Sequence, residues 1–427
     1  MTRPVTVISP LHAPGNPYVG AAYDSLCAQS FREWTWLILE NHGGIAPPHL
    51  RDDPRVHVLQ APGDSPHGIG ALKGALCEAV ESPFVVELDA DDLLEPRALE
   101  LVLAAFERDG ADFVFSDFAE FRDDGGGRWT PNTYNPAFGW ESYPVTFQGH
   151  ELRAMRAPEA SEHNVRRVEW APNHVRAWRL ETYRRVGGHD RAFDVGDDHD
   201  LMTRMLLEGG RFVHVPECLY FYRVHAQNTV ATKNAAIGAA TERIYNARIW
   251  ALGEHFARRL DLARVDLCGA HDPPLGYHVL DRHVPPGVSG IACDLEQAWP
   301  LETSSVGVLR AHDALEHLAD PVHAMNEAHR VLAPGGFLMV SVPSTNGLGA
   351  FCDPTHRSFW NHLSFRYYTD PGFARYVPAF RGRFQVARVI EWFPSDWHLR
   401  ENVPYVEAHL FALKDGGAKI MGANLWR

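Results

Sequence analysis

Three carboxylates follow an apolar, β-branched run at residues 84–88. In the segment FVVELDADD they are Asp89, Asp91 and Asp92. Carboxylates this close repel one another unless a cation lies between them, and oxygen ligands suit Mg²⁺ or Mn²⁺. A cation held there neutralises a diphosphate and stabilises it as a leaving group. The alternative is a solvated turn in which Asp92 caps the helix that follows.

A second group of acids leads into a predicted helix. The segment GGHDRAFDVGDDHDLMTRMLLEGG carries Asp194, Asp197, Asp198 and Asp200. The helix dipole favours carboxylates in a first turn, so helix capping accounts for one of them. A carboxylate held near a metal-bound diphosphate also acts as a general base on an acceptor hydroxyl. Together, the two acidic segments point to a metal-assisted transfer reaction.

The chain of 427 residues is acidic, with a formal net charge of −14. Binding to nucleic acid depends on a basic surface, which the overall charge does not provide, although a local basic patch stays open. An acidic protein that handles anionic nucleotides needs a cation as intermediary. The charge therefore agrees with the interpretation of the acidic segments.

The composition is that of a globular protein, with 45% hydrophobic and 22% charged residues. No run approaches the roughly 18 apolar residues that cross a bilayer, and the N-terminus lacks the apolar core of a signal peptide. Six cysteines are scattered without a CxxC pair. We therefore expect reduced thiols and a cytoplasmic protein.

The N-terminal half alternates predicted strands and helices, which would hold the acidic segments in place. Apolar runs predict strands at residues 4–8, 36–40, 55–59, 84–88 and 112–116, and helical patterns between them lie at residues 18–30, 70–81 and 95–109. Such alternation favours a mostly parallel sheet covered on both faces. Ligands collect at the carboxyl edge of such a sheet, where the strand-end acids would lie.

The later part of this half is less regular. Residues 122–173 are rich in glycine, proline and aromatic residues, and are expected to form loops, short strands and an acceptor-binding insertion. A helix is predicted at residues 197–209 and a strand pair at residues 211–223. Residues 234–262 have a helical composition and are expected to connect two domains, at residues 1–233 and 263–427.

The C-terminal half predicts a second doubly wound α/β unit. The expected strands and the helix between them lie at residues 264–268, 277–281, 289–294, 305–313, 320–332 (the helix) and 337–342. The fold class is thus α/β, with two Rossmann-like units in one chain.

The N-terminal half resembles a family 2 glycosyltransferase of GT-A fold over roughly residues 4–230. The resemblance rests on four segments in the family's order: VTVISP, SLCAQSFREWTWLILENHG, IGALKGALCEAVESPFVVELDADD and GGHDRAFDVGDDHDLMTRML. It implies an inverting single displacement that moves a sugar from a nucleoside-diphosphate sugar, by family habit a UDP-sugar, to an acceptor hydroxyl. Mn²⁺ or Mg²⁺ is the implied cofactor.

The resemblance also assigns roles to single residues. Asp89 and Asp91 match the DxD motif, with Asp91 as the direct metal ligand. His225, in YFYRVHAQNT, lies where many relatives place a further metal-contacting histidine. Asp198 matches the second acid of the family's Glu-Asp pair, which is the expected catalytic base. The remaining nucleotide-sugar-binding positions are Pro10, Glu40, Asn41, Lys73 and Asp197.

Some of these positions depart from the family's pattern. Glu40 and Asn41 stand where two aspartates are usual, Lys73 replaces a common arginine, and Asp197 replaces the glutamate. The acidic or basic character is kept at the positions that carry the chemistry. The departures leave the identity of the nucleotide open.

Residues 264–356 resemble a class I S-adenosylmethionine-dependent methyltransferase. VDLCGAHDPPLGYHVLD matches the first strand, glycine loop and second strand of that family. Glycines in this loop let the backbone approach the cofactor, but here the loop reads Cys268-Gly269-Ala270 and two prolines follow. The resemblance assigns S-adenosylmethionine contacts to Gly269, Asp281 and Asp294. The stiffer, bulkier loop predicts a degenerate domain.

Three functions therefore stay open. The first is a glycosyltransferase with a non-catalytic second domain, the second is a bifunctional glycosyltransferase and methyltransferase, and the third is a non-catalytic scaffold. The acceptor is a glycan, a small molecule or a hydroxymethylated DNA base, and the oligomeric state is not readable. His312, Glu316 and His317 in AHDALEH are assigned no metal, and His356 in DPTHR is a further candidate site residue.

Overall fold

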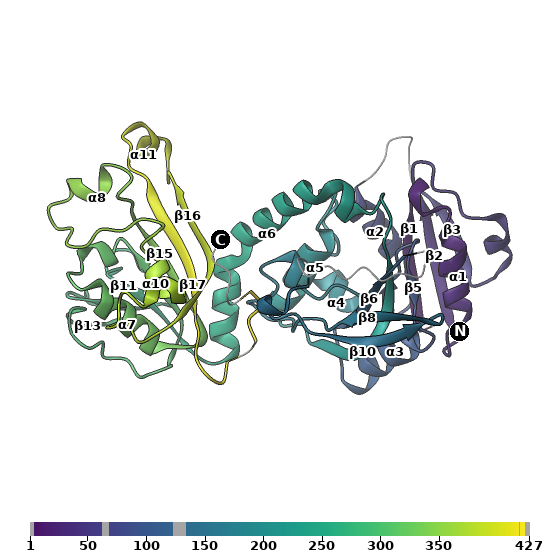
Figure 1. Ribbon diagram of the computed structural model, residues 1–427, viewed down its shortest axis with the longest axis horizontal. Helices are drawn as coiled ribbons and strands as arrows, with labels where there is room; N and C mark the ends of the chain where they lie inside the picture. Colours follow the sequence, from purple (N-terminus) through teal and green to yellow (C-terminus); the bar gives the residue numbers. More distant parts are fainter. Residues whose placement is uncertain (1–3, 62–67, 123–133, 418, 423–427) are drawn as a thin grey trace. The chain divides into compact units, whose positions relative to one another are not determined.

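The computed structural model describes residues 4–61, 68–122, 134–417 and 419–422. The chain divides into two compact units, Met1–Ile249 and Trp250–Arg427, each with its own sheet (Figure 1). The division falls inside helix α6 (Thr229–Arg259), in the region expected to connect two domains. Among the described residues, no helix combines the length and the apolar character that crossing a membrane requires.

The first unit is built on a ten-stranded sheet. Its main path is β3-β2-β1-β4-β9-β6-β10-β5, and the hairpin β7–β8 joins the path at β6. The strands are β1 (Val5–Leu11), β2 (Trp34–Glu40), β3 (Val56–Gln60), β4 (Phe84–Glu87), β5 (Leu93–Leu94), β6 (Phe113–Phe121), β7 (Ser142–Phe147), β8 (His150–Met155), β9 (Arg176–Arg179) and β10 (Phe212–Arg223). On the main path β9 and β5 run against the other strands. The predicted α/β fold with a mostly parallel sheet is confirmed.

Helices pack on both faces of this sheet because side chains alternate along each strand. Val85 of β4 joins a core with Leu72 of α2 and Met205 of α5. The neighbouring Phe84 points the other way, and its ring stacks 4.5 Å from that of Phe106 in α3. The helices that cover the sheet are α1 (Val19–Cys27), α2 (Ile69–Glu78), α3 (Ala98–Arg108), α4 (Leu180–Arg185) and α5 (Asp197–Leu207).

In the first unit, the sequence did not reveal strand β9. It lies between β4 and β6 and runs antiparallel to both. The register pairs Arg176, the first residue of β9, with Glu87, the last residue of β4. A basic side chain therefore enters the carboxyl edge of the sheet from a strand of the opposite direction.

One further region differs from expectation, and another agrees with it. The expected strand pair at residues 211–223 is the single strand β10 (Phe212–Arg223). Its pairing with β6 shifts between Val215 and Cys218, where Pro216 has no N–H for the ladder, and again between Cys218 and Tyr220. In the expected insertion, the described part contains the hairpin β7–β8, which pairs with β6. Residues 123–133 of that insertion lie outside the described residues.

The first half of α6 belongs to the first unit. Ala240 and Ile244 on this helix pack against Phe193 and Val195, which lie in the loop before α5. The loop that carries the second acidic segment is therefore packed against residues far beyond it in sequence.

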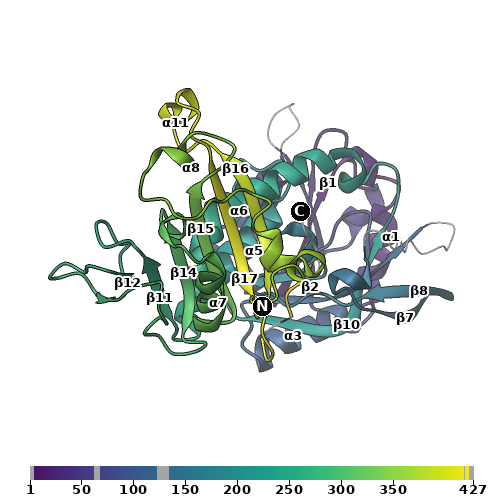
Figure 2. The same cartoon turned by 60° about the vertical axis from the view of Figure 1, so that its left-hand side comes forward.

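The second unit contains a seven-stranded sheet in the order β13-β12-β11-β14-β15-β17-β16 (Figure 2). Strands β11 to β15 are parallel, and β17 runs antiparallel to β15 and β16. The strands are β11 (Ala263–Leu267), β12 (His278–Asp281), β13 (Gly290–Ala292), β14 (Val306–His312), β15 (Leu332–Pro343), β16 (Phe384–Trp392) and β17 (Tyr405–Ala412). The last two were not predicted, although both segments are rich in β-branched and aromatic residues.

Helices cover this second sheet unevenly. Met325 of α7 (Pro321–Val331) packs on one face with Leu338, while Phe256 of α6 lies on the other, 5.5 Å from the ring of Phe337. Residues 268–305, all of them described, contain no helix. The proline pairs of HDPPLGY and HVPPGVS interrupt this stretch, and proline disfavours helix interiors. Short helices follow β15: α8 (Gly349–Cys352), α9 (Arg366–Thr369), α10 (Pro371–Ala374) and α11 (Asp396–Arg400).

Candidate functional site

The carboxyl ends of the parallel strands in the first unit bring the first group of acids together. Leu11 pairs with Glu40 at the ends of β1 and β2, and Pro10 pairs with Leu39. Strand β4 lies on the other side of β1 and leads into the DxD segment. The structure thus places Pro10, Glu40, Asn41, Asp89 and Asp91 at one edge, as strand order alone requires.

Asp91 faces a histidine from a distant segment. His225 follows β10, and its Nε2 lies 2.9 Å from Oδ2 of Asp91. The imidazole stacks on Tyr18, with ring centroids 5.2 Å apart, so its orientation is fixed by packing. The side chains of Asp91 and His225 are 23% and 11% exposed, which leaves both accessible to an ion. The structure therefore brings together the two residues that the sequence analysis nominated as metal ligands.

Asp92 has a structural role that differs from helix capping. It is fully buried, accepts a hydrogen bond from the Tyr220 hydroxyl at 2.8 Å and accepts another from the Arg223 N–H at 2.6 Å. Burial, with Asp91 and Asp89 nearby, raises the pKa of Asp92 well above its usual value. Helix α3 begins later, at Ala98. The hydrogen bonds of Asp92 thus attach the DxD segment to β10.

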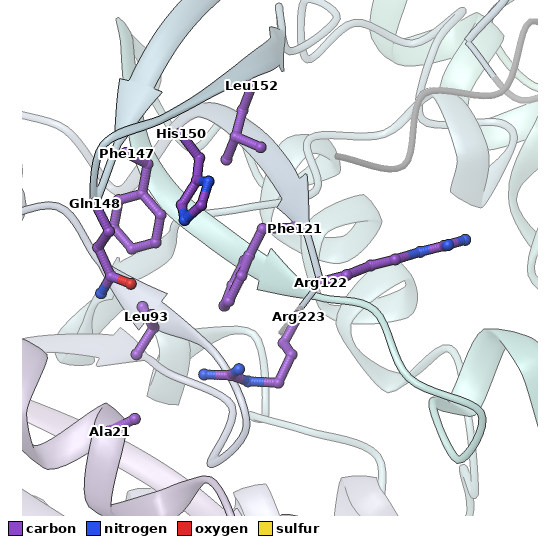
Figure 3. Close-up of a pocket in the computed structure, with 9 residues that line it drawn as sticks. All are labelled: Ala21, Leu93, Phe121, Arg122, Phe147, Gln148, His150, Leu152 and Arg223. Atoms are coloured by element: carbon purple, nitrogen blue, oxygen red, sulfur yellow. The ribbon is translucent and has the colours of Figure 1, made fainter. Parts of the chain in front are cut away.

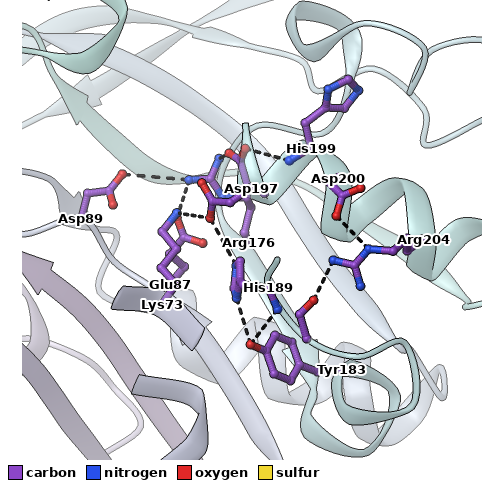
Figure 4. A network of polar contacts seen from close by, with 12 residues as sticks. Lys73, Glu87, Asp89, Arg176, Tyr183, His189, Asp197, His199, Asp200 and Arg204 are labelled. Carbon is purple, nitrogen blue, oxygen red and sulfur yellow. Dashed lines mark hydrogen bonds and ion pairs between the residues drawn. The ribbon is translucent and has the colours of Figure 1, made fainter. Parts of the chain in front are cut away.

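A buried ion cluster lies beside the DxD segment (Figure 4). Lys73 of α2 donates to Oε1 of Glu87 at 2.7 Å, and Arg176 of β9 binds the same oxygen. Burial alone would raise the pKa of Glu87, but Arg176 and Lys73 hold it well below its usual range. The expected diphosphate contact, Lys73, is only 3% exposed, and its ammonium also lies 3.6 Å from Oδ2 of Asp197.

Arg176 joins the two acidic segments. One of its nitrogens lies 2.6 Å from Oδ2 of Asp198, and another lies 4.0 Å from Oδ2 of Asp89. Its side chain is 7% exposed, so the guanidinium bonds to these acids largely away from water. Sequence reasoning missed this residue because its role depends on the reversed strand β9. No local motif in the sequence marks it.

Asp198 is positioned at the first turn of α5. Its Oδ1 accepts the N–H of His199 at 2.7 Å, one of the N–H groups of the first turn that have no partner within the helix, and Oδ2 faces Arg176. Burial alone would raise the pKa of Asp198, but Arg176 and Lys73 outweigh burial and hold the pKa below the usual range. The side chain is 20% exposed. Asp198 is therefore an ionised carboxylate that solvent or a substrate reaches.

The pKa values of Asp89 and Asp197 are raised, whereas that of Asp198 is lowered. Burial and the neighbouring Glu87 raise the pKa of Asp89 to about 6. Burial raises the pKa of Asp197 to about 7, and Asp198 adds to this effect while Lys73 opposes it. Asp197 is 2% exposed and also lies 3.5 Å from Nε2 of His189. Asp197 therefore contacts the buried ion cluster on the side that faces the protein interior, through Lys73 and His189.

The raised pKa of Asp197 predicts a pH dependence of stability. In the native protein the carboxyl keeps its proton up to about pH 7, whereas in the unfolded chain it loses the proton near pH 4. The free energy of unfolding should therefore fall as the pH rises from about 4 to about 7. The isosteric Asp197→Asn variant should lose this part of the slope in urea unfolding followed across that range. The exposed Asp194→Asn should keep it, and an unchanged slope in Asp197→Asn would refute the assignment.

Two of the expected nucleotide-sugar contacts, Glu40 and Asn41, form hydrogen bonds within the protein. Glu40 accepts from the Ala46 N–H at 2.7 Å and from Arg51 at 3.0 Å, and it also bonds Gln60. The side-chain amide of Asn41 lies 3.2 Å from Nδ1 of His12. Both positions are nearly buried, so they shape the loop after β2.

A pocket of about 170 Å³ opens next to the DxD segment (Figure 3). Arg223 contributes to its wall, while the Nε of this residue donates to the carbonyl oxygen of Asp91 at 2.8 Å. The hairpin β7–β8, within the insertion expected to bind an acceptor, supplies part of the lining. The lining residues are Ala21, Leu93, Phe121, Arg122, Phe147, Gln148, His150, Leu152 and Arg223.

In the second unit, the expected S-adenosylmethionine contacts Gly269 and Asp281 lie close to other groups of the protein. A Cβ at Gly269 would lie 1.8 Å from Oδ2 of the buried Asp266, so the glycine leaves room for this carboxylate of β11. Asp281 accepts the N–H of Ala270 at 3.4 Å and that of His283 at 3.2 Å.

Asp294, the third of the expected S-adenosylmethionine contacts, is exposed at its side chain and lies 3.2 Å from Arg282. Within residues 268–305, all of them described, no helix follows the loop after β11, so this stretch offers no helix N-terminus to face a cofactor as such units usually do. The residues present therefore fit S-adenosylmethionine poorly.

Two family descriptions match the chain. Residues 6–164 match the model described as glycosyl transferase family 2, and residues 265–340 match the model described as methyltransferase domain. The two matches fall in the two structural units. The first match ends before Arg176, Asp198 and His225.

Curated relatives match part of the chain. The O-antigen biosynthesis protein RfbC of Myxococcus xanthus is 26% identical over 284 residues, which cover 64% of this chain and 19% of RfbC. The hyaluronan synthase of Pasteurella multocida is 26% identical over 184 residues, which cover 43% of this chain and 16% of that enzyme. The chain thus spans less than one fifth of the length of either relative.

Solved structures resemble the chain at low similarity. S. aureus TarS 1–349 in complex with UDP-GlcNAc has a TM-score of 0.43 at 14% identity, covering 64% of this chain and 76% of that one. The mannosyltransferase PcManGT of Pyrobaculum calidifontis, in complex with GDP-Man and Mn²⁺, has a TM-score of 0.35 at 17% identity and covers 61% and 65%.

Proposed function

We propose that this chain, in which a family 2 glycosyl transferase domain is joined to a methyltransferase-type domain, transfers a sugar from a nucleoside-diphosphate sugar to an acceptor hydroxyl. The observation that carries the proposal is the convergence of both acidic segments on Arg176, which contacts Asp198 and lies within ion-pair range of Asp89. A scaffold without catalytic function would have no need for this many carboxylates at one edge.

The residues present fit a divalent cation. Asp91 offers a carboxylate oxygen and His225 an imidazole nitrogen, a donor set that suits Mn²⁺ and, through the oxygen, Mg²⁺. Magnesium-like ions are usually held by one or two protein ligands, with water and substrate phosphates completing the shell. When bound, such an ion would neutralise charge on the departing diphosphate.

Asp198 is the general base in this proposal. Its low pKa keeps it ionised at neutral pH, and its partial exposure lets an acceptor hydroxyl reach it. The carboxylate takes the proton of that hydroxyl while the oxygen attacks the anomeric carbon and the bond to the diphosphate breaks. Attack opposite the leaving group inverts the anomeric configuration, so we propose an inverting transfer.

We further propose that the second unit does not methylate. The proposal rests on the absence of a helix from residues 268–305, all of them described, and on the hydrogen bonds that Asp281 accepts within the protein. UDP-sugars are the first donors to test. Because the matched relatives are named for O-antigen biosynthesis and hyaluronan synthesis, saccharides are the first acceptors to test.

The function is tested with a panel of sugar nucleotides, with and without Mn²⁺, and mass spectrometry of the products. In parallel, calorimetry measures the binding of UDP plus Mn²⁺ and of S-adenosylmethionine. We expect release of a nucleoside diphosphate from at least one donor and no binding of S-adenosylmethionine. Failure of the whole panel, together with no binding of any nucleoside diphosphate, would refute the proposal.

Asp91→Asn is expected to weaken Mn²⁺-dependent UDP binding by at least about tenfold, because an amide oxygen is a poorer, uncharged ligand. The measurement is the dissociation constant of UDP at fixed Mn²⁺. Asp109→Asn, at the opposite edge of the same sheet and in an exposed pair with Arg108, is the matched control and should bind as the wild type does. Equal dissociation constants for Asp91→Asn and the wild type would remove Asp91 from the metal site.

A further inference from the structure

A second cluster of metal-ligating side chains lies in the second unit. Glu316 and His317 come from a short 3-10 turn after β14, η5 (Leu315–His317), and His356 comes from the loop after α8. Each of the three residues offers one ligating atom, and these three atoms lie within 4.8 Å of one another. Among the described residues, this is the group of three metal-ligating side chains that lie close enough to hold one ion. The sequence analysis assigned this segment no metal because the spacing of Glu316 and His317 is ordinary.

Packing alone does not explain why the carboxylate of Glu316 is buried. It is 3% exposed, and within the described chain neither of its carboxylate oxygens has a hydrogen-bond partner. A buried carboxylate without a partner is costly, and such groups usually pair or coordinate a metal. The backbone is well fixed, since the Glu316 carbonyl accepts the N–H groups of Arg357 at 2.7 Å and Ser358 at 3.0 Å. These two bonds also hold the His356 loop against the turn.

The two histidines are oriented in the manner of metal ligands. Nδ1 of His356 lies 3.0 Å from the Ala350 carbonyl oxygen, and Nδ1 of His317 lies 3.1 Å from the Thr355 hydroxyl. Metal-bound histidines commonly use one ring nitrogen for such a contact and the other for the ion. The Nε2 atoms are then the nitrogens left to coordinate. Asp353, whose Oδ2 lies 3.9 Å from Nε2 of His356, adds negative charge at the solvent side.

The donor set defines the class of ion. Two imidazole nitrogens and one carboxylate oxygen suit first-row transition metals, and this combination recurs with Zn²⁺ in sites that keep an open position. The hard ions Mg²⁺ and Ca²⁺ prefer shells made of oxygen. The cluster also lies after a parallel strand, at the carboxyl edge where such sheets receive ligands.

We propose that Glu316, His317 and His356 form a Zn²⁺ site in the second unit, with a coordination position open to water or a ligand oxygen. The site is independent of the glycosyl transfer proposed for the first unit. It gives the methyltransferase-type unit an ion-binding role where its nucleotide loop fits a cofactor poorly.

The test uses the full chain, stripped with a chelator and then titrated with Zn²⁺ and with Co²⁺ in the absence of nucleotide. We expect the wild type to bind Zn²⁺ with micromolar or tighter affinity, to melt at a higher temperature with Zn²⁺, and to show the visible absorption of Co²⁺ bound by nitrogen ligands. Glu316→Gln and His356→Asn should each lose one equivalent of Zn²⁺ and the Co²⁺ spectrum. His323→Asn, at a half-buried histidine of α7, is the matched control and should keep both.

Variants of the first unit separate the two sites. Asp91→Asn should leave the Co²⁺ spectrum of this site unchanged, and Glu316→Gln should leave Mn²⁺-dependent UDP binding unchanged. The metal-free Glu316→Gln protein should melt no lower than the metal-free wild type, since the amide is nearly the same size as the carboxyl and carries no charge at this buried position; this shows that the variant folds. The proposal is overturned if Glu316→Gln and His356→Asn bind as much Zn²⁺ as the wild type, or if the wild type binds none.

Discussion

Replacing Asp198 with asparagine is expected to lower the rate of sugar transfer by roughly a hundredfold to ten-thousandfold, the usual contribution of a general base. The amide still offers Arg176 an oxygen, so the ion cluster keeps most of its geometry. It does not accept the acceptor's proton. The loss should therefore appear in kcat, measured at saturating donor, while the dissociation constant of UDP plus Mn²⁺ stays within about threefold of the wild type.

The exposed Asp194 provides the control for this prediction. It belongs to the same acidic segment, and Asp194→Asn should leave kcat unchanged. If Asp198→Asn retained the wild-type kcat, the base would have to be sought elsewhere in the cluster. A fall in UDP affinity without a fall in kcat would instead assign Asp198 to donor binding.

Replacing Arg176 with glutamine is expected to destabilise the chain by about 3–5 kcal/mol, the range found when one partner of a buried ion pair is removed. Glu87, 2% exposed at its side chain, would keep only Lys73 as a charged partner, and Asp198 would lose its contact. The free energy of unfolding from urea titration, monitored by the tryptophan fluorescence of the chain, measures this loss.

Two further variants test whether the loss of stability comes from the buried ion pairs of Arg176. Arg191→Gln removes an exposed pair with Glu78, whose side chains are 58% and 69% exposed, and should change the free energy of unfolding by no more than about 1 kcal/mol. Glu87→Gln combined with Arg176→Gln should recover part of the loss, because the unpaired carboxylate is gone. If Arg176→Gln unfolded like Arg191→Gln, the buried cluster would not be held by Arg176.

The strand-end acids could be predicted from the sequence because their placement follows from local patterns. An apolar strand followed by acids defines the DxD segment, and strand order alone brings Pro10 and Glu40 to the same edge. The DxD segment and the second acidic segment were also identifiable by family resemblance. The family assignment and the fold class are confirmed, whereas the roles of the single residues stay predictions.

The rest of the site depends on which residues pair across strands that are far apart in the sequence. No sequence pattern indicates this pairing. Arg176 acts through its pairing with Glu87, 89 positions away. The family resemblance named Lys73 as a nucleotide-sugar contact, but its local pattern does not indicate its burial against Glu87. The sequence analysis named His356 as a candidate site residue but did not place it beside Glu316, because the two segments meet only through the hydrogen bonds of a loop.

The dependence of the DxD segment on β10 sets the smallest fragment of this chain that is worth expressing. Asp92 is fastened by Tyr220 and Arg223, and the second acidic loop packs on Ile244 of α6. A fragment cut at residue 164, where the family match stops, would lack all of these supports and would expose the hydrophobic face of the sheet. A boundary at Ile249, the end of the first compact unit, retains them.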